Sequence, residues 1–233
     1  MFQTALDENR RLRYTTILVI CFSLVAPLLL MYFITPWLKP LVGQTAYMAI
    51  YEICFWVMAL VVLAVVLCWE RESLRSIGLR GLTVKEGLLS LLVGMLLFVL
   101  VPTLGIFMER VLGIATSTME IVAALAKYPI WFRALLSARA GLVEEVLYRG
   151  YPIERVNRLT GRIWPGVLIS LIIHTALHIP HLGIGHTVAV VFPLSTLLAG
   201  LYVWKRNLTL NIIVHFLIDL FAMVLLPLLP FFS

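Results

Sequence analysis

The stretch GLVEEVLYRGY, residues 141–151, places two adjacent carboxylates and an arginine in a chain that is otherwise apolar enough to lie in a bilayer. A charge in the middle of a membrane costs from about 2.5 to more than about 10 kcal/mol, so such charges are expected to pair and to line a functional cavity. We therefore expect this stretch to face the inside of a bundle and to mark a functional site.

The composition around this stretch indicates a polytopic membrane protein. Of the 233 residues, 62% are hydrophobic and 13% are charged, whereas soluble domains are about 45–50% apolar. The net charge of +6 comes from short basic clusters between apolar segments, which argues against a nucleic-acid partner and indicates topology signals. Cys21, Cys54 and Cys68 lie within apolar segments at no disulfide or metal spacing, so we expect buried thiols.

Apolar segments of roughly 20 residues, the length that crosses the hydrocarbon core, predict an all-α fold. We expect one domain, residues 1–233, forming a transmembrane bundle of about 7–8 helices. A short amphipathic or partly inserted helix at 112–126 makes the eighth element, and the first span is expected to be retained rather than cleaved as a signal peptide. The seven predicted spans are 15–37, 46–68, 87–107, 129–148, 164–180, 188–204 and 208–229.

Basic residues mark every second connection between the predicted spans. The positive-inside rule then places the N-terminus in the cytoplasm and the Glu144–Glu145 pair toward the cytoplasmic end of the fourth span. Short loops favour a prokaryotic plasma membrane. The basic clusters are Arg10, Arg11 and Arg13; Arg71, Arg75, Arg80 and Lys85; Arg155, Arg158 and Arg162; and Lys205 and Arg206.

Helical periodicity separates the two neighbouring glutamates. Residues four apart share a helix face, whereas adjacent residues point about 100° apart. Glu145 is therefore expected to meet Arg149 in an internal ion pair, which leaves Glu144 free to accept a proton.

Two further spans carry polar residues four apart. His174 and His178 lie in the fifth span, and His215 and Asp219 lie in the seventh, so the three polar stripes are expected to converge on one cavity. A carboxylate with an imidazole activates water as a general base, and a second histidine donates to a developing oxyanion. This combination predicts hydrolysis.

Each residue also has a plainer explanation. A single histidine in a membrane helix often packs or bonds to another helix, a Glu–Arg pair can be structural, and His181 and His186 fall in a predicted outer loop where solvation suffices. Three helices that carry such groups together are nevertheless costly to insert without a use.

Metal and serine chemistries lack their local signatures. The zinc motif HExxH is absent, although Glu144, His178 and His215 are residue types that ligate metals. The GxSxG elbow is absent too, so a serine mechanism would have to recruit Ser137, Ser170 or Ser195. We expect no metal and no cofactor.

Three ordered motifs carry a family resemblance: Glu144-Glu145-x-x-x-Arg149-Gly150, Ser170-Leu-Ile-Ile-His174-Thr-Ala-Leu-His178, and Asn207-Leu-Thr-Leu-Asn-Ile-Ile-Val-His215 followed by Asp219. Over roughly residues 130–225 the chain resembles the CAAX prenyl protease and bacteriocin-processing family of intramembrane glutamic endopeptidases, which are related to the type II CAAX prenyl endopeptidase.

The resemblance implies roles by position. Glu144 would be the base that activates water together with His178, and His215 with Asp219 would stabilise the oxyanion or orient the substrate carbonyl. Glu145 and Arg149 would support the site. The remaining supporting residue departs from the pattern, because His174 stands where the family commonly has Phe; Asp219 replaces the Asn of some members.

The resemblance implies a peptide or protein substrate, with or without a lipid anchor, that reaches the site from the membrane lipid. Two other classes stay open. A transporter or channel should show paired halves, which this sequence lacks. A scaffold or a bacteriocin self-immunity protein would use the same cavity without cleaving anything. The oligomeric state is undetermined.

Depth poses one problem for a shared site. A straight fifth span from Trp164 puts His178 about 20 Å along the helix at 1.5 Å per residue, deeper than a Glu144 near the cytoplasmic end. Either that span is tilted or starts late, or the Arg149 region is itself sunk below the surface.

Overall fold

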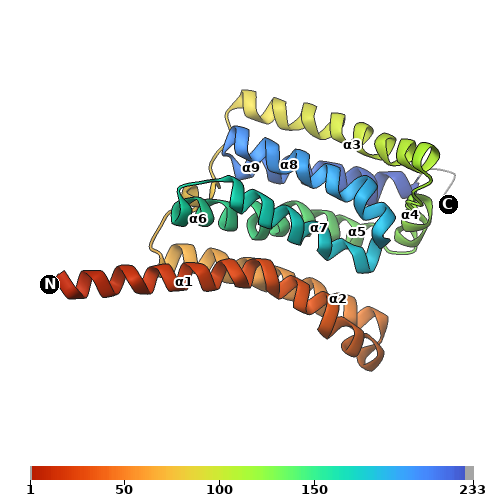
Figure 1. The fold of residues 1–233 in the computed structure, drawn as a ribbon. Helices are drawn as coiled ribbons and strands as arrows, with labels where there is room; N and C mark the ends of the chain where they lie inside the picture. Colours follow the sequence, from red (N-terminus) through yellow and green to blue (C-terminus); the bar gives the residue numbers. More distant parts are fainter. Residues whose placement is uncertain (1, 229–233) are drawn as a thin grey trace.

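The computed structural model describes residues 2–228, and side chains for residues 12–228 apart from Leu112. Regular structure in this part of the chain is helical throughout (Figure 1). Its α-helices are α1 (Phe2–Leu29), α2 (Thr35–Ala64), α3 (Val84–Leu112), α4 (Thr118–Ala126), α5 (Ile130–Arg139), α6 (Tyr151–Thr160), α7 (Trp164–His186), α8 (Phe192–Lys205) and α9 (Leu208–Leu220). Wider π-helical turns are η1 (Leu30–Ile34), η2 (Val65–Trp69), η4 (Ala140–Gly150), η5 (Thr187–Val191) and η6 (Phe221–Leu225), and 3₁₀ turns are η3 (Leu74–Ile77) and η7 (Leu226–Leu228).

The helices lie side by side as an up-and-down bundle (Figure 1). Within residues 2–228, four helical stretches are long and apolar enough to cross a membrane: Leu12–Trp69, Val84–Val111, Trp164–Lys205 and Leu208–Leu228. The first and third are interrupted at Gly43 (φ +76°) and Gly183 (φ +75°), where only glycine adopts positive φ at little cost. Each of these two stretches therefore holds two of the predicted spans. The predicted all-α membrane bundle is confirmed, although the predicted last residue, 229, lies outside the described residues.

The predicted span 129–148 is not among the four apolar stretches, because its charges lower its hydropathy. It is instead the first part of one continuous helix, in which α5, η4 and α6 follow one another and end at Gly161 (φ +71°). Thr160 is 16 residues beyond Glu144, and Trp164 is 14 residues before His178. Since α6 and α7 are joined by a tight turn, the two side chains reach similar depths, about 20–25 Å at 1.5 Å per residue. The Arg149 region therefore lies well inside this long helix rather than at its end, which explains how Glu144 and His178 reach a similar depth.

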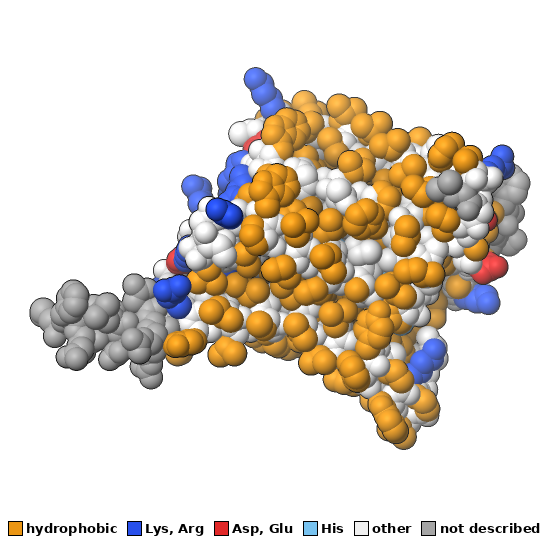
Figure 2. All heavy atoms as spheres, viewed as in Figure 1, with side chains coloured by type: hydrophobic (Ala, Val, Ile, Leu, Met, Phe, Trp, Pro, Cys, Tyr) orange, Lys and Arg blue, Asp and Glu red, His pale blue; other side chains and the backbone are white. Residues whose placement is uncertain are grey.

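Hydrophobic side chains cover the flank of the bundle, while Lys and Arg gather at the end where α6 lies and a few stand at the other end (Figure 2). This belt fits a protein whose flank contacts lipid. The predicted burial of the cysteines is wrong for Cys21 and Cys68, which are exposed, and Cys54 is half-buried. Apolar residues facing lipid need no burial in protein, because the membrane is their solvent.

α9 packs closely against η4, and glycine makes this contact possible. A Cβ added at Gly141 would lie 2.8 Å from the backbone N and Cα of Phe216, the neighbour of His215. Backbone atoms cannot rotate away as a side chain does, so any larger residue must push α9 outward.

We expect Gly141→Ala to destabilise the protein by about 1–3 kcal/mol, the usual cost of overpacking, and to displace His215. Thermal unfolding in detergent measures the loss. Gly200→Ala is the matched control, because a Cβ there meets nothing within 4 Å in α8. Equal stability of the two variants would contradict the close contact.

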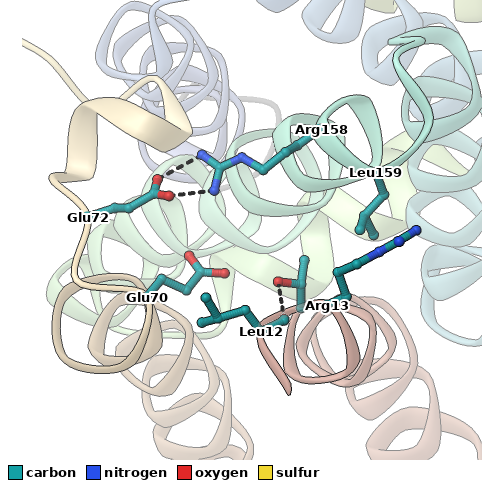
Figure 3. Close-up of a pocket in the computed structure, with 7 residues that line it drawn as sticks. Leu12, Arg13, Glu70, Glu72, Arg158 and Leu159 are labelled. Carbon is teal, nitrogen blue, oxygen red and sulfur yellow. Dashed lines mark hydrogen bonds and ion pairs between the residues drawn. The ribbon is translucent and has the colours of Figure 1, made fainter. Parts of the chain in front are cut away.

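The end of the bundle near α6 is held by an ion-pair cluster. Arg155 is fully buried and contacts Glu70 Oε2 at 2.6 Å, and Arg158 contacts Glu72 Oε1 at 2.5 Å and Oε2 at 2.8 Å. Figure 3 shows Glu72 and Arg158 facing each other at the edge of a cleft of about 480 Å³ that also holds Leu12 and Arg13. These contacts tie the loop after α2 to α6.

The Glu72–Arg158 pair predicts a stability change in acid. Hydrogen bonds from the Arg158 guanidinium lower the pKa of the Glu72 carboxyl below its usual 4.5. A carboxyl whose pKa is lower in the folded state stabilises the protein above its unfolded pKa, and this contribution is lost as pH falls through the folded value. We expect the stability difference between wild type and Glu72→Gln to shrink as pH falls below about 4.5. Unfolding in detergent at pH 7 and pH 3.5 measures it, and a constant difference would contradict the pair's contribution.

Candidate functional site

A cavity of about 540 Å³ opens between α2, α4, η4, α7, α8 and α9. Five of the seven predicted site residues line it, and the other two, Glu145 and Arg149, lie behind the wall, buried. The predicted convergence of three helices on one cavity is therefore present in the structure. The five lining residues are Glu144, His174, His178, His215 and Asp219.

Glu144 is not the free carboxylate that the helical-face argument suggested. Its Oε1 accepts from Arg139 Nη1 at 2.6 Å, and its Oε2 lies 2.9 Å from His174 Nε2. Only 3% of Glu144 is exposed. Each carboxylate oxygen has two lone pairs, so each oxygen of Glu144 can accept one further hydrogen bond.

The Arg139–Glu144 contact follows from the width of the helix. In an α-helix, residues five apart point about 140° from each other at 100° per residue. η4 is π-helical, and its hydrogen bonds join residues five apart, so these residues lie about one turn above each other. Arg139 directly precedes η4 and thus reaches the next turn, where Glu144 lies.

Glu52 of α2 completes this arrangement. Its Oε1 accepts from Arg139 Nε at 3.0 Å, its exposure is 4%, and the Phe55 ring lies 5.0 Å from the guanidinium carbon. The sequence analysis missed both Arg139 and Glu52. The signal was available, because each is a charged residue within a predicted membrane span, where a charge indicates a partner.

Glu145 forms a second, separate network. Its Oε1 lies 3.0 Å from Arg149 Nη1 and 2.9 Å from His215 Nδ1, and its Oε2 accepts from Asn211 Nδ2 at 3.2 Å. Glu145 is fully buried and Arg149 is 2% exposed. The expected Glu145–Arg149 contact is present, and it also fixes the α9 histidine.

The two α7 histidines are held through their Nδ1 atoms. His178 Nδ1 lies 2.9 Å from the His174 carbonyl, which only accepts, so Nδ1 carries the proton and Nε2 keeps its lone pair. His174 Nδ1 lies 2.8 Å from Ser195 Oγ, a hydroxyl that donates or accepts as required. The rings of the two histidines are 4.8 Å apart.

His215 faces the same cavity from α9. With Nδ1 on Glu145, its Nε2 points toward Asp219 Oδ2 at 3.6 Å. This separation is an ion-pair distance but too long for a hydrogen bond. Both groups therefore keep polar atoms available to a carbonyl oxygen in the cavity.

The expectation of solvated histidines in an outer loop holds for one residue only. His181 is exposed, but it lies on helix α7 and on the cavity wall. His186 is buried, with Nδ1 3.0 Å from the Thr116 carbonyl. The loop was placed too early, because α7 continues past Pro180 to His186.

The site combines a carboxylate and imidazoles at water-bridging distances. Ligand atoms of Glu144, His174 and His178 all lie within 4.8 Å of one another. One water that bonds to two of them spans such a gap, and the same three residue types are those that hold a transition metal. The chemistry available is thus activation of water next to a polarised carbonyl.

Comparison with protein families gives a match for residues 126–221, to the family described as type II CAAX prenyl endopeptidase Rce1-like. Over these residues the chain is similar to that family. The matched region runs from α4 to the start of η6 and contains all seven predicted site residues, so the resemblance seen in the sequence is confirmed. Glu52, on α2, lies outside the match. Comparisons with curated proteins and with solved structures gave no match.

The four apolar helical stretches and the match to a CAAX endopeptidase family support an integral membrane protein. The Rce1-like region supplies the walls of the cavity through η4, α7, α8 and α9. The N-terminal helices add α2, and with it the carboxylate of Glu52, to the same site.

Proposed function

We propose that the protein is an intramembrane endopeptidase that hydrolyses a membrane-associated or prenylated peptide with water activated by glutamate and histidine. The single observation that carries this proposal is a buried carboxylate, Glu144, beside two imidazoles in an apolar cavity of about 540 Å³. The match of residues 126–221 to a peptidase family supports it.

The proposed mechanism assigns each group by its position. A water held between Glu144 Oε2 and His178 Nε2 gives its proton to Glu144 while its oxygen attacks the scissile carbonyl. His215 donates to the resulting oxyanion from Nε2 when the ring carries both protons, and Asp219 orients that ring. Protonated Glu144 then returns the proton to the leaving amine, which restores the carboxylate.

Supporting residues hold these groups in place. Arg139 and His174 hold the two oxygens of Glu144, and Glu145 holds His215. A catalytic group fixed in this way loses little freedom in the transition state. The surrounding apolar wall excludes bulk water and suits a substrate with a lipid chain or an apolar side chain.

The proposed setting is a prokaryotic plasma membrane with the N-terminus in the cytoplasm. The basic end of the bundle, near α6, then faces the cytoplasm, as the positive-inside rule requires. Single cysteines placed at Arg162 and Glu120 in a variant without native cysteines test this. Labelling of the Glu120 position alone from outside intact cells is expected, and labelling of the Arg162 position alone would reverse the topology.

Peptide cleavage tests the function directly. The purified protein in detergent is incubated with a panel of farnesylated CAAX peptides, their unprenylated versions and bacteriocin leader peptides, beside Glu144→Gln. We expect cleavage by the wild type alone. Two folded proteins that both leave the whole panel intact would favour a scaffold or self-immunity role in the same cavity.

A further inference from the structure

Glu144, His174 and His178 together present the donor set of a transition-metal site. The two histidines are four apart on α7 and so share one face of the helix, as paired zinc-binding histidines on a helix do. Two histidines with one glutamate form the protein ligands of several zinc enzymes. We propose that this triad binds a divalent ion of the Zn²⁺ class and that the bound ion inhibits the proposed peptidase.

The proposal depends on the residue that departs from the expected pattern. A Phe in place of His174 would leave one glutamate and one histidine, which is a poor metal site. His174 adds the third ligand and directs Nε2 at Glu144 Oε2 from 2.9 Å. His174, which stands where the family commonly has Phe, thus creates a new binding capacity in this chain.

Hydrogen bonds to Nδ1 already orient the His174 and His178 rings, as metal sites require. Metal-bound histidines usually give their other N–H to a carbonyl, carboxylate or water, and these partners matter for affinity. His178 gives Nδ1–H to the His174 carbonyl at 2.9 Å, and His174 Nδ1 has Ser195 Oγ at 2.8 Å. When a metal takes His174 Nε2, the proton moves to Nδ1 and the Ser195 hydroxyl becomes the acceptor.

Charge around the triad favours a cation independently. Glu52 and Glu144 share one guanidinium, that of Arg139, so this buried group carries a surplus negative charge. Glu52 is 4% exposed, and its Oε2 has no hydrogen-bond partner among the described residues. A divalent ion on Glu144 Oε2 would offset that surplus, while Oε1 stays on Arg139.

The distances require only small shifts, in which the Glu144 and His174 ligand atoms, 2.9 Å apart, separate slightly and His178 approaches them. The ligand atoms lie within 4.8 Å of one another, whereas bonds of about 2.0–2.1 Å in a tetrahedron put them about 3.3 Å apart. His178 is only half-buried and lines the cavity, so its ring has room to approach. The fourth position faces the cavity and is open to water.

Inhibition follows from the ligands and rests on the proposed function. A metal on Glu144 Oε2 and His178 Nε2 occupies the two atoms that would otherwise hold and deprotonate the catalytic water. Removal of the ion by a chelator should therefore raise peptide cleavage rather than abolish it.

Direct metal binding tests the site without reference to catalysis. The purified, chelator-treated protein is titrated with Zn²⁺ by equilibrium dialysis, and with Co²⁺ as a spectroscopic probe of ligand geometry. We expect one ion per chain, bound at least about tenfold more weakly by His174→Phe, Glu144→Gln and His178→Ala, and about tenfold more weakly by Ser195→Ala, which removes an outer contact. His181→Phe is the matched control on the same helix and cavity wall, and it should bind as the wild type does.

The outcomes separate the two proposals. A wild type that binds no more tightly than the triad variants, or a His181→Phe that loses binding equally, overturns the metal site. Each variant is first checked for a monodisperse profile in detergent, and Glu144→Gln keeps the size of the side chain so that folding is preserved. A chain that cleaves peptide but binds no metal refutes this inference alone. One that binds Zn²⁺ through the triad supports it even if no peptide is cleaved, in which case the proposed peptidase fails instead.

Discussion

Glu144→Gln is expected to lower kcat by about 10²–10⁴-fold, the usual contribution of a general base, while the protein stays folded. The variant is expected to stay folded because the charges around Arg139 remain balanced. Glu144 shares Arg139 with Glu52, so removal of its charge leaves one carboxylate with one guanidinium. Initial rates of peptide cleavage together with unfolding in detergent measure both effects. Glu120→Gln, an exposed change on α4, is the control and should alter neither.

The neighbouring glutamate should behave in the opposite way. Glu145→Gln leaves the buried guanidinium of Arg149 without a carboxylate, because the described residues offer it no second ion-pair partner. Breaking a buried pair in this way costs about 3–5 kcal/mol. Near-wild-type turnover of Glu144→Gln, or equal stability of the two variants, would show that the roles of the adjacent carboxylates are wrongly divided.

Arg139→Gln is expected to have the largest effect on stability. The change leaves two carboxylates, Glu52 and Glu144, buried close to each other with no counter-charge. Loss of one partner of a buried pair costs about 3–5 kcal/mol, and this cluster has two dependent charges. Chemical denaturation in detergent should show a large loss, whereas Arg110→Gln, an exposed change at the end of α3, should stay near wild type.

A neutral variant distinguishes lost charge balance from lost packing. With Glu52→Gln, Arg139→Gln and Glu144→Gln combined, the cluster keeps its shape and carries no charge. Replacing a whole buried ion cluster is often neutral or stabilising, so much of the lost stability should return. Failure to recover would mean that packing of Arg139 on Phe55, rather than its charge, holds this part of the bundle together.

The site shows where helical periodicity suffices and where it fails. The 3.6-residue repeat correctly paired Glu145 with Arg149, four residues apart, and put His174 and His178 on one face. It did not place Arg139 next to Glu144, five residues apart, because that contact needs the wider turns of η4. Helix width depends on packing around the segment, and a local repeat does not reveal it.

Depth in the membrane shows the same division. The sequence placed Glu144 near the cytoplasmic end, because the apolar signal of its span fades at residue 148. The helix continues to Thr160. The charged side chains of α6 can be accommodated there because they form ion pairs with Glu70, Glu72 and Arg206. Such partners come from distant parts of the chain, so hydropathy alone ended the span too early.

The sequence by itself determined the membrane class, the helical architecture and the candidate residues of the proposed site, because hydropathy and ordered motifs are local properties of the chain. Tertiary structure alone decided which groups meet. Glu52 reaches Arg139 across 87 positions, and His174 reaches Ser195 across 21. Contacts of this kind depend on how helices pack and turn, and they set the charge balance around Glu144 on which both catalysis and metal binding would depend.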